Sequence, residues 1–193
     1  VARRAAALER AELPTVTEVA RRAPATLAWA AALPELLPPP FRIDGAVCDH
    51  GRAAALTAAR IAWLAHVDPV PAFLAGLLHD VGRSYLEGLA ASVEPSRRPR
   101  PATLGQVADG LHPTLGAALL ERWALPLEAQ LAVEHHHRPG PAVPPPLRRL
   151  VRVLRAADLF AGLLLSPSPA LDAGPRAREL EHHLRALHLA PDF

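Results

Sequence analysis

Apolar residues recur every three or four positions between residues 49 and 66, a spacing that predicts a helix with one buried face. The next segment, Val70 to His79, is almost entirely apolar, so the helix predicted there should lie at the centre of the fold. Further helices are expected at residues 85–93, 112–123, 126–137, 147–165 and 177–189. No strand-like alternation of apolar and polar residues competes with these patterns. The sequence therefore predicts an all-α fold.

Prolines divide this pattern into segments. Residues 1–13 and 15–37 predict additional helices, and the run Pro38 to Pro40 predicts an extended connector, because each proline disfavours helix in the residue before it. Pro113 suits the first turn of a helix that begins at His112. We therefore expect an N-terminal helical extension at 1–45, a compact helical core at 46–165 and a C-terminal helix at 166–193. The extension could cover the core or pair two chains in a homo-oligomer.

Composition excludes several classes of protein. The chain has 193 residues and is 50% hydrophobic, which is enough for one main core. A formal net charge of +2 does not indicate a nucleic-acid-binding surface. The single cysteine, Cys48, cannot form an internal disulfide, which fits a reducing compartment. No run approaches the ~20 apolar residues of a membrane span, and no signal-peptide pattern stands out. A cytoplasmic protein is expected.

His79 and Asp80 stand side by side at the end of an apolar run. Burying an imidazole and a carboxylate together is costly unless their charges are compensated, and a metal ion would supply the compensation. Neighbouring helical residues point about 100° apart, so one ion could reach both only where the helix ends, and Gly82 is the expected stop. A mixture of imidazole and carboxylate suits Mn, Fe, Zn or Co better than Mg or Ca. The other candidate ligands are His50, His112, His135 to His137 and Asp158.

The ordered set His50, His79-Asp80 and Asp158 resembles the signature of the HD-domain metal-dependent phosphohydrolases. That signature is a His, then His-Asp, then a distant Asp, carried on a compact helical core. The run Phe73 to Gly82 is especially similar. The resemblance covers residues 46–165 and implies a metal-dependent hydrolase of phosphate esters.

A subset of that superfamily, which includes the HD-GYP phosphodiesterases, adds a His-Pro before a helix and a later His-His pair. Here His112-Pro113 matches the first, and aligning Ala132-Val133 with that family's helix places the pair at His136-His137, with His135 as the spare. The resemblance then implies two divalent transition metal ions, Fe or Mn, with Zn and Co as alternatives. It places His50, His79 and Asp158 on one ion, His112, His136 and His137 on the other, and Asp80 between them as the bridging and catalytic residue.

Arginines are the candidate substrate-binding residues. After His-Asp-x-Gly the same subset usually has Lys, and this chain has Arg83, which could bind phosphate or complement a helix C-terminus. The loop at 94–102 is either a solvated basic linker or an arm that meets a substrate phosphate through Arg97, Arg98 and Arg100. The Gly-Tyr-Pro segment of the HD-GYP group is replaced by Arg138-Pro139-Gly140, so the resemblance does not extend to hydrolysis of cyclic di-GMP.

Two functions follow from these resemblances. The leading one is hydrolysis of a phosphomonoester or phosphodiester, with a nucleotide as the expected substrate, by a metal-activated water. The alternative is a non-catalytic signalling module that docks a partner. It arises because HDOD domains are similar at residues 73–80, 116–123 and 136–137, and many of them lack part of the ligand set, which this chain keeps. His182, His183 and His188 are expected to face solvent on the last helix.

Overall fold

The computed structural model describes residues 45–139, 142–166 and 169–189. Within these ranges every regular element is helical and no strand occurs, so the all-α prediction is confirmed. The helices predicted at 1–13 and 15–37 lie outside the described residues. The elements are α4 (Gly45–Leu64), α5 (Pro69–Leu78), α6 (Val81–Ser92), η1 (Pro95–Arg97), α7 (Pro101–Arg122), α8 (Leu127–His135), η2 (Pro145–Leu147), α9 (Arg148–Leu164) and α10 (Pro169–Ala186).

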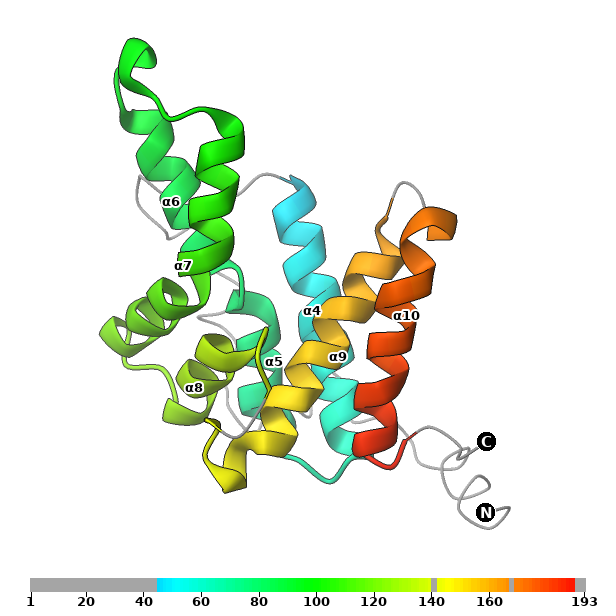
Figure 1. The fold of residues 1–193 in the computed structure, drawn as a ribbon. Coiled ribbons are helices and arrows are strands. Elements are labelled where there is room, and N and C mark those ends of the chain that lie inside the picture. The colour runs from blue at the N-terminus through cyan, green and yellow to red at the C-terminus, as the bar shows by residue number, and fades with distance from the viewer. Residues whose placement is uncertain (1–44, 140–141, 167–168, 190–193) are drawn as a thin grey trace.

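The short helix α5 lies at the centre, as its apolar sequence predicts, and it contacts α4, α8 and α9 (Figure 1). Asp68 begins the helix because its side chain accepts a hydrogen bond from the Val70 amide at 2.9 Å. Gly76 lets α4 approach closely, since a Cβ at this position would lie 2.7 Å from the Ala55 Cα. This packing buries the end of α5, where His79 follows.

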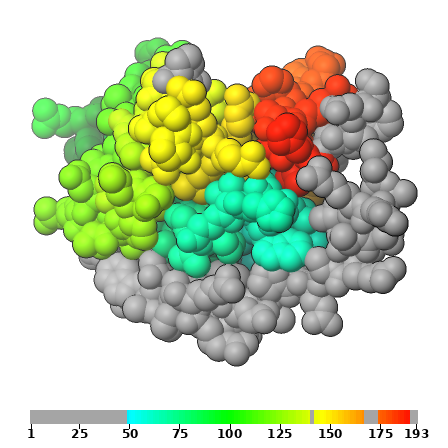
Figure 2. Space-filling view, turned by 90° about the horizontal axis from the view of Figure 1, so that it is seen from below, coloured from blue at the N-terminus to red at the C-terminus, as the bar shows by residue number. Residues whose placement is uncertain are grey.

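Helix α9 is the other main core element. Its buried residues include Val151, Leu154 and Ala157, and it packs between α4 and α10. Seen from below, the first part of α9 lies between α8 and the end of α10 (Figure 2). No helix in the described part of the chain is long and apolar enough to cross a membrane.

Helices α6 and α7 form a hairpin that projects from this core (Figure 1). The sequence predicts that Gly82 ends a helix, and this prediction is wrong. Helix α5 ends at Leu78, and α6 begins at Val81, so the chain turns at His79 and Asp80 without a glycine at positive φ. Gly82 is instead a contact point, because a Cβ there would overlap the His112 carbonyl oxygen and lie 2.8 Å from the Gly116 nitrogen.

Two helices begin earlier than predicted. Helix α7 starts at Pro101 rather than His112, which leaves Pro113 inside the helix. Helix α10 starts at Pro169 rather than residue 177 and contains Pro175. In both cases an interior proline removes one backbone hydrogen bond, and the helix continues through it. The loop predicted at 94–102 is correspondingly shorter and includes the turn η1.

The last helix is less solvated than expected. His182 and His188 are exposed, as predicted, but His183 is only 5% exposed, so the prediction is wrong for this residue. His183 lies on the side of α10 that packs on α9. The helical periodicity of residues 177–189 was recognised, but which face of the helix packs depends on the orientation of α9.

Candidate metal centre

Three residues from separate helices meet at one end of the core. His50 comes from α4, His79 follows the last residue of α5, and Asp158 comes from α9. The Nε2 atom of His50 lies 3.2 Å from Nε2 of His79 and 3.2 Å from Oδ1 of Asp158. The same Asp158 oxygen lies 3.5 Å from Nε2 of His79. We call these three residues the first ligand group.

Three histidines form a second ligand group beside the first. His112 comes from α7, and His136 and His137 follow the end of α8. The Nε2 atom of His112 lies 3.4 Å from Nε2 of His136 and 3.0 Å from Nε2 of His137. These ring nitrogens are close enough together to bind a single metal ion.

Asp80 lies between the two groups. Its Oδ2 atom is 3.5 Å from Nε2 of His79, and its Oδ1 atom is 3.4 Å from Nε2 of His112. The residue occupies the turn between α5 and α6, so its side chain can point differently from that of His79. The structure therefore brings together all seven predicted ligands: His50, His79, Asp80, His112, His136, His137 and Asp158.

The histidine hydrogen bonds fit metal binding. The Nδ1 atoms of His79, His112 and His136 lie 2.8, 2.8 and 2.6 Å from the backbone carbonyl oxygens of residues 76, 108 and 133. A carbonyl oxygen can only accept, so each Nδ1 carries a proton, and in the neutral form of each ring Nε2 keeps a free lone pair. Buried Nε2 atoms that converge in this state are suitable donors for a transition metal ion. The residues present therefore fit the metal that the sequence implies.

Charge is concentrated in the first group. Burial lowers the pKa of His79, but the carboxylates of Asp80 and Asp158 outweigh it and raise this pKa to about 9. Burial raises the pKa of Asp158, but hydrogen bonds with His50 and His79 bring it well below its usual value. Without a metal ion, the protonated His79 therefore supplies the positive charge that balances the carboxylates.

The second group is neutral. Burial is the largest effect on the pKa of His136, and it lowers this pKa to about 3 together with the nearby His79 and His137. Burial also lowers the pKa values of His112 and His137. Neutral imidazoles are the form that binds metal, so this group carries no positive charge that would repel an arriving ion.

His135 lies apart from both groups. Its Nε2 atom is 4.0 Å from a carboxylate oxygen of the exposed Glu134, and none of the described hydrogen bonds or ion pairs joins it to His112. That His136 and His137 are the metal-binding pair, with His135 as the spare, stays a prediction. Among the described ion pairs, Glu134 contacts only this spare histidine.

Arg83 stands at a cavity beside the second group. The cavity has a volume of about 400 Å³, and its wall includes Arg83, Asp109, Thr114, Glu134, His137 and Arg138. The guanidinium of Arg83 donates a hydrogen bond to the exposed carboxylate of Asp109. Burial lowers the pKa of Arg83, but Asp109 and Asp80 outweigh this effect and raise it, so the side chain stays charged.

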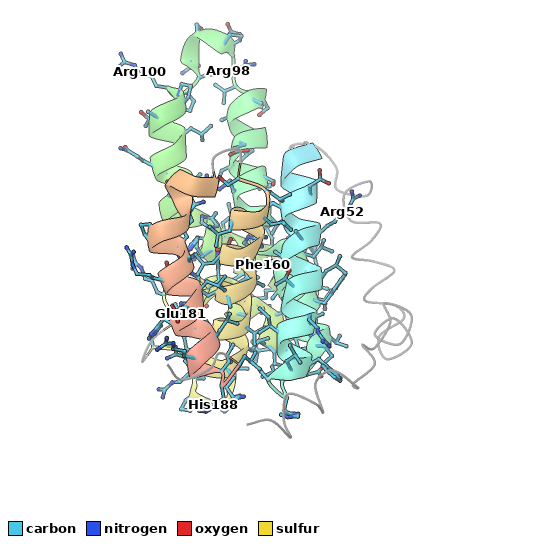
Figure 3. All side chains as sticks on the ribbon, turned by 90° about the vertical axis from the view of Figure 1, so that its right-hand side faces the viewer. Arg52, Arg98, Arg100, Phe160, Glu181 and His188 are labelled. Carbon is cyan, nitrogen blue, oxygen red and sulfur yellow. The ribbon has the colours of Figure 1, made fainter. Side chains whose placement is uncertain are left out.

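The other predicted arginines are not brought to this cavity. Arg98 and Arg100 lie at the far end of the α6–α7 hairpin (Figure 3), and Arg97 is in the turn η1 at the same tip. Arg98 donates hydrogen bonds of 2.8 Å to the carbonyl oxygens of Ala91 and Val93, where α6 ends. It therefore stabilises a helix end, and a substrate role for the three tip arginines stays a prediction.

Sequence reasoning missed two residues next to the site, Asp109 and Arg155. Asp109 pairs with Arg83 from one turn before His112. Arg155 contacts both Asp158 and His137 from one turn before Asp158. The one available signal was the three-residue spacing of each from a predicted ligand on a helix. The spacing could indicate the pair of Arg155 with Asp158, but not the contacts with Arg83 and His137, because these two residues lie outside the helices that carry Asp109 and Arg155.

The fold and the site together define a helical protein with two adjoining groups of candidate metal ligands. The family model of the HD domain matches residues 47–163. The chain therefore belongs to the HD domain family, whose members are generally metal-dependent hydrolases. Comparison with curated proteins and with solved structures found no match.

Proposed function

We propose that this protein is a metal-dependent phosphohydrolase that cleaves a phosphomonoester or phosphodiester, with a nucleotide as the expected substrate. The observation that carries the proposal is the position of Asp80, whose two oxygens each face a different ligand group at 3.5 and 3.4 Å. A carboxylate in this position can bridge two cations, an arrangement suited to activating water for phosphoryl transfer. The expected ions are Fe or Mn, with Zn or Co as alternatives.

Each ligand has a defined part in this proposal. His50, His79 and Asp158 would hold one ion, His112, His136 and His137 the other, and Asp80 both. Bound ions would lower the pKa of a shared water and neutralise charge on the phosphoryl oxygens. The protein fixes the ligands in advance, since the backbone carbonyls at 76, 108 and 133 hold three of the rings.

Arg83 is the proposed phosphate-binding residue. Its guanidinium is half-buried, remains charged and lines the cavity that also includes His137. A planar guanidinium can donate two parallel hydrogen bonds to a phosphate, so Arg83 would orient the substrate beside the second ion. Asp109 occupies part of this donor fork in the structure, so the substrate would have to compete with it.

The test is a metal analysis followed by an activity assay. Purified protein is analysed for Fe, Mn and Zn, stripped with a chelator, reloaded with each metal, and assayed with p-nitrophenyl phosphate and bis(p-nitrophenyl) phosphate. A panel of nucleotides follows, and Asp80→Asn serves as the inactive control. We expect metal-dependent release of nitrophenol that the control lacks.

The alternative, an HDOD-like signalling module, predicts different results. Protein that Mn and Fe cannot activate on any substrate contradicts the proposed hydrolase. Capture of a specific partner that survives Asp80→Ala, together with absent hydrolysis across the nucleotide panel, would support the signalling module. The presence of all seven candidate ligands favours the hydrolase, because a docking surface does not require convergent ring nitrogens.

A further inference from the structure

Arg155 connects the candidate metal centre to the C-terminal helix. It lies on α9, one turn before Asp158, and its side chain is 15% exposed. Its Nη1 atom lies 2.9 Å from Oδ2 of Asp158 and 3.0 Å from Nδ1 of His137. Its Nε atom donates a 2.8 Å hydrogen bond to Oε1 of Glu179 on α10. One side chain therefore joins both ligand groups to a helix that holds none of the ligands.

The contact with Asp158 separates the roles of that residue's two oxygens. Oδ1 faces His50 and His79, whereas Oδ2 accepts from Arg155. A carboxylate held in this way presents one oxygen to a metal and cannot rotate to present the other. Hydrogen bonds to charged groups are among the stronger ones in proteins, and partners of this kind commonly tune metal affinity.

The contact with His137 is of a different kind. A guanidinium can only donate, so Nδ1 of His137 accepts this hydrogen bond. In His79, His112 and His136 the equivalent atom donates to a carbonyl oxygen, which is the arrangement that supports metal binding through Nε2. The contact with His137 therefore does not support metal binding through Nε2. The contact with Asp158 does support metal binding, because it leaves Oδ1 free to face the ion.

Glu179 holds Arg155 from the side away from the ligands. The hydrogen bond from Arg155 lowers the pKa of Glu179, so the carboxylate stays charged. The buried His183 lies 3.7 Å from the same Oε1 atom and flanks the pair on α10. Residues 179 and 183 both lie beyond residue 163, where the HD domain match ends.

We propose that Arg155 is a positioning residue for the metal centre, held by Glu179 and orienting Asp158 toward the first ion. Through this pair the C-terminal helix, outside the matched domain, sets the affinity of the first ligand group for metal. The inference rests on the proposed metal centre but not on the proposed hydrolysis, because metal binding itself is the readout.

The experiment compares Mn²⁺ binding by the full chain and four variants, using equilibrium dialysis. Arg155→Gln should weaken binding of the ion held by the first ligand group by about 10- to 100-fold, the usual effect of removing a ligand's hydrogen-bonding partner. Glu179→Gln should give a smaller loss in the same direction, because Arg155 stays but loses its anchor. The visible spectrum of Co²⁺-loaded protein should also change in Arg155→Gln, since the ligand geometry of the first ion changes.

The two matched controls are Glu181→Gln and Arg149→Gln. Glu181 lies on the same helix as Glu179 and pairs only with Arg185 among the described ion pairs, at 2.5 Å. Arg149 lies on the same helix as Arg155 and donates a 2.7 Å hydrogen bond to the Ala65 carbonyl. Both controls should bind Mn²⁺ like the unmodified protein.

Three other outcomes of the binding experiment would contradict the inference. Unmodified protein that binds Mn²⁺, with unchanged affinity in Arg155→Gln and Glu179→Gln, overturns the inference and leaves the proposed function standing. Equal losses in Glu179→Gln and Glu181→Gln would mean a general charge effect of α10 and also overturn it. Unmodified protein that binds neither Mn²⁺ nor Co²⁺ overturns both proposals.

If Arg155→Gln does not fold, the Mn²⁺ affinity of Glu179→Gln decides whether the inference holds. The Glu179 side chain is 41% exposed, so its replacement should not disturb the packing.

Discussion

The Oδ1 atom of Asp80 lies 3.4 Å from Nε2 of His112, a residue carried by a different helix of the projecting hairpin. The other Asp80 oxygen faces His79 at 3.5 Å. Asp80 is therefore the carboxylate placed to contact both ligand groups, whereas Asp158 faces only the first. Burial raises the pKa of Asp80, but His79 and His112 outweigh it and lower this pKa, so the side chain is ionised and ready to bind metal.

Replacing Asp80 should reduce the amount of bound metal more than replacing Asp158. Asp80→Asn keeps the size of the side chain but removes the charge that both ions share, so we expect weakened binding of both and activity near background. Asp158→Asn should weaken binding of the first ion only. Counting Mn²⁺ ions bound per chain at increasing Mn²⁺ concentration measures the difference. Retention of two tightly bound ions by Asp80→Asn would contradict the bridging role.

The three consecutive histidines should separate into two ligands and one bystander. His136→Ala should abolish binding of the second ion, because His136 is fully buried and lies 3.4 Å from His112. His135→Ala should leave metal content unchanged, because its only described partner is Glu134 at the surface. Metal analysis of the two variants side by side is the measurement. An unchanged His136→Ala with a depleted His135→Ala would shift the pair by one residue.

The sequence alone predicts the helices that have a simple apolar periodicity, and it indicates the candidate ligands in their order along the chain. The predicted spans at 49–66, 70–79 and 147–165 correspond to α4, α5 and α9 within a few residues. His79-Asp80 stood out because two polar groups end an apolar run. The family resemblance adds His50 before this pair and Asp158 after it as further ligands. The structure brings these residues together.

The errors have a common physical cause, since local rules do not include tertiary packing. The sequence favours a first helical turn for Pro113, but α7 packs against α6 and continues through the proline. The sequence also favours Gly82 as a helix stop, but in the fold its small size permits the close contact with His112. Arg155 carried no signal of its role, because Glu179 and His137 approach it only when α10 and α8 pack around α9.

The close contact at Gly82 predicts a large effect of a single methyl group. Gly82→Ala would place a Cβ against the His112 carbonyl oxygen, so α6 and α7 must separate. We expect the free energy of unfolding to fall by about 1–3 kcal/mol, and second-ion affinity to fall because His112 moves. Gly105→Ala is the control, since nothing lies within 4 Å of a Cβ there, and it should slightly stabilise α7. Urea unfolding of both variants checks the prediction, and equal stabilities would contradict it.

The raised pKa of His79 predicts opposite pH dependences with and without metal. The folded-state pKa of about 9 exceeds the usual histidine pKa of 6.5, so protonated His79 stabilises the metal-free fold fully below pH 6.5. That stabilisation, about 3 kcal/mol at one unit per 1.4 kcal/mol, is lost as pH rises from 6.5 to 9. Metal competes with the same proton, so Mn²⁺ affinity should rise over this window.

Thermal unfolding from pH 6 to 9.5, with chelator and with excess Mn²⁺, tests both slopes. The depressed pKa of His136, about 3, acts below pH 6.5 and so does not disturb this window. His79→Gln should flatten the metal-free profile. A metal-free protein whose stability is constant or rises between pH 6.5 and 9 would show that His79 is not protonated there.

The ion pair between Arg83 and Asp109 predicts a separation of substrate binding from metal binding. Arg83→Gln should raise KM for a phosphate ester without changing Mn²⁺ affinity, since Arg83 contacts no residue of either ligand group among the described hydrogen bonds and ion pairs. Asp109→Asn should instead lower KM a few-fold at most, because an exposed ion pair is weak and the freed guanidinium can bind phosphate. The Asp109 side chain is 69% exposed, so its replacement should not unfold the protein.

Steady-state kinetics at low and high salt measure both effects on KM. Salt should reduce the decrease of KM in Asp109→Asn by screening the phosphate contact. A raised KM in Asp109→Asn would mean that Asp109 holds Arg83 in its working position rather than competing with substrate.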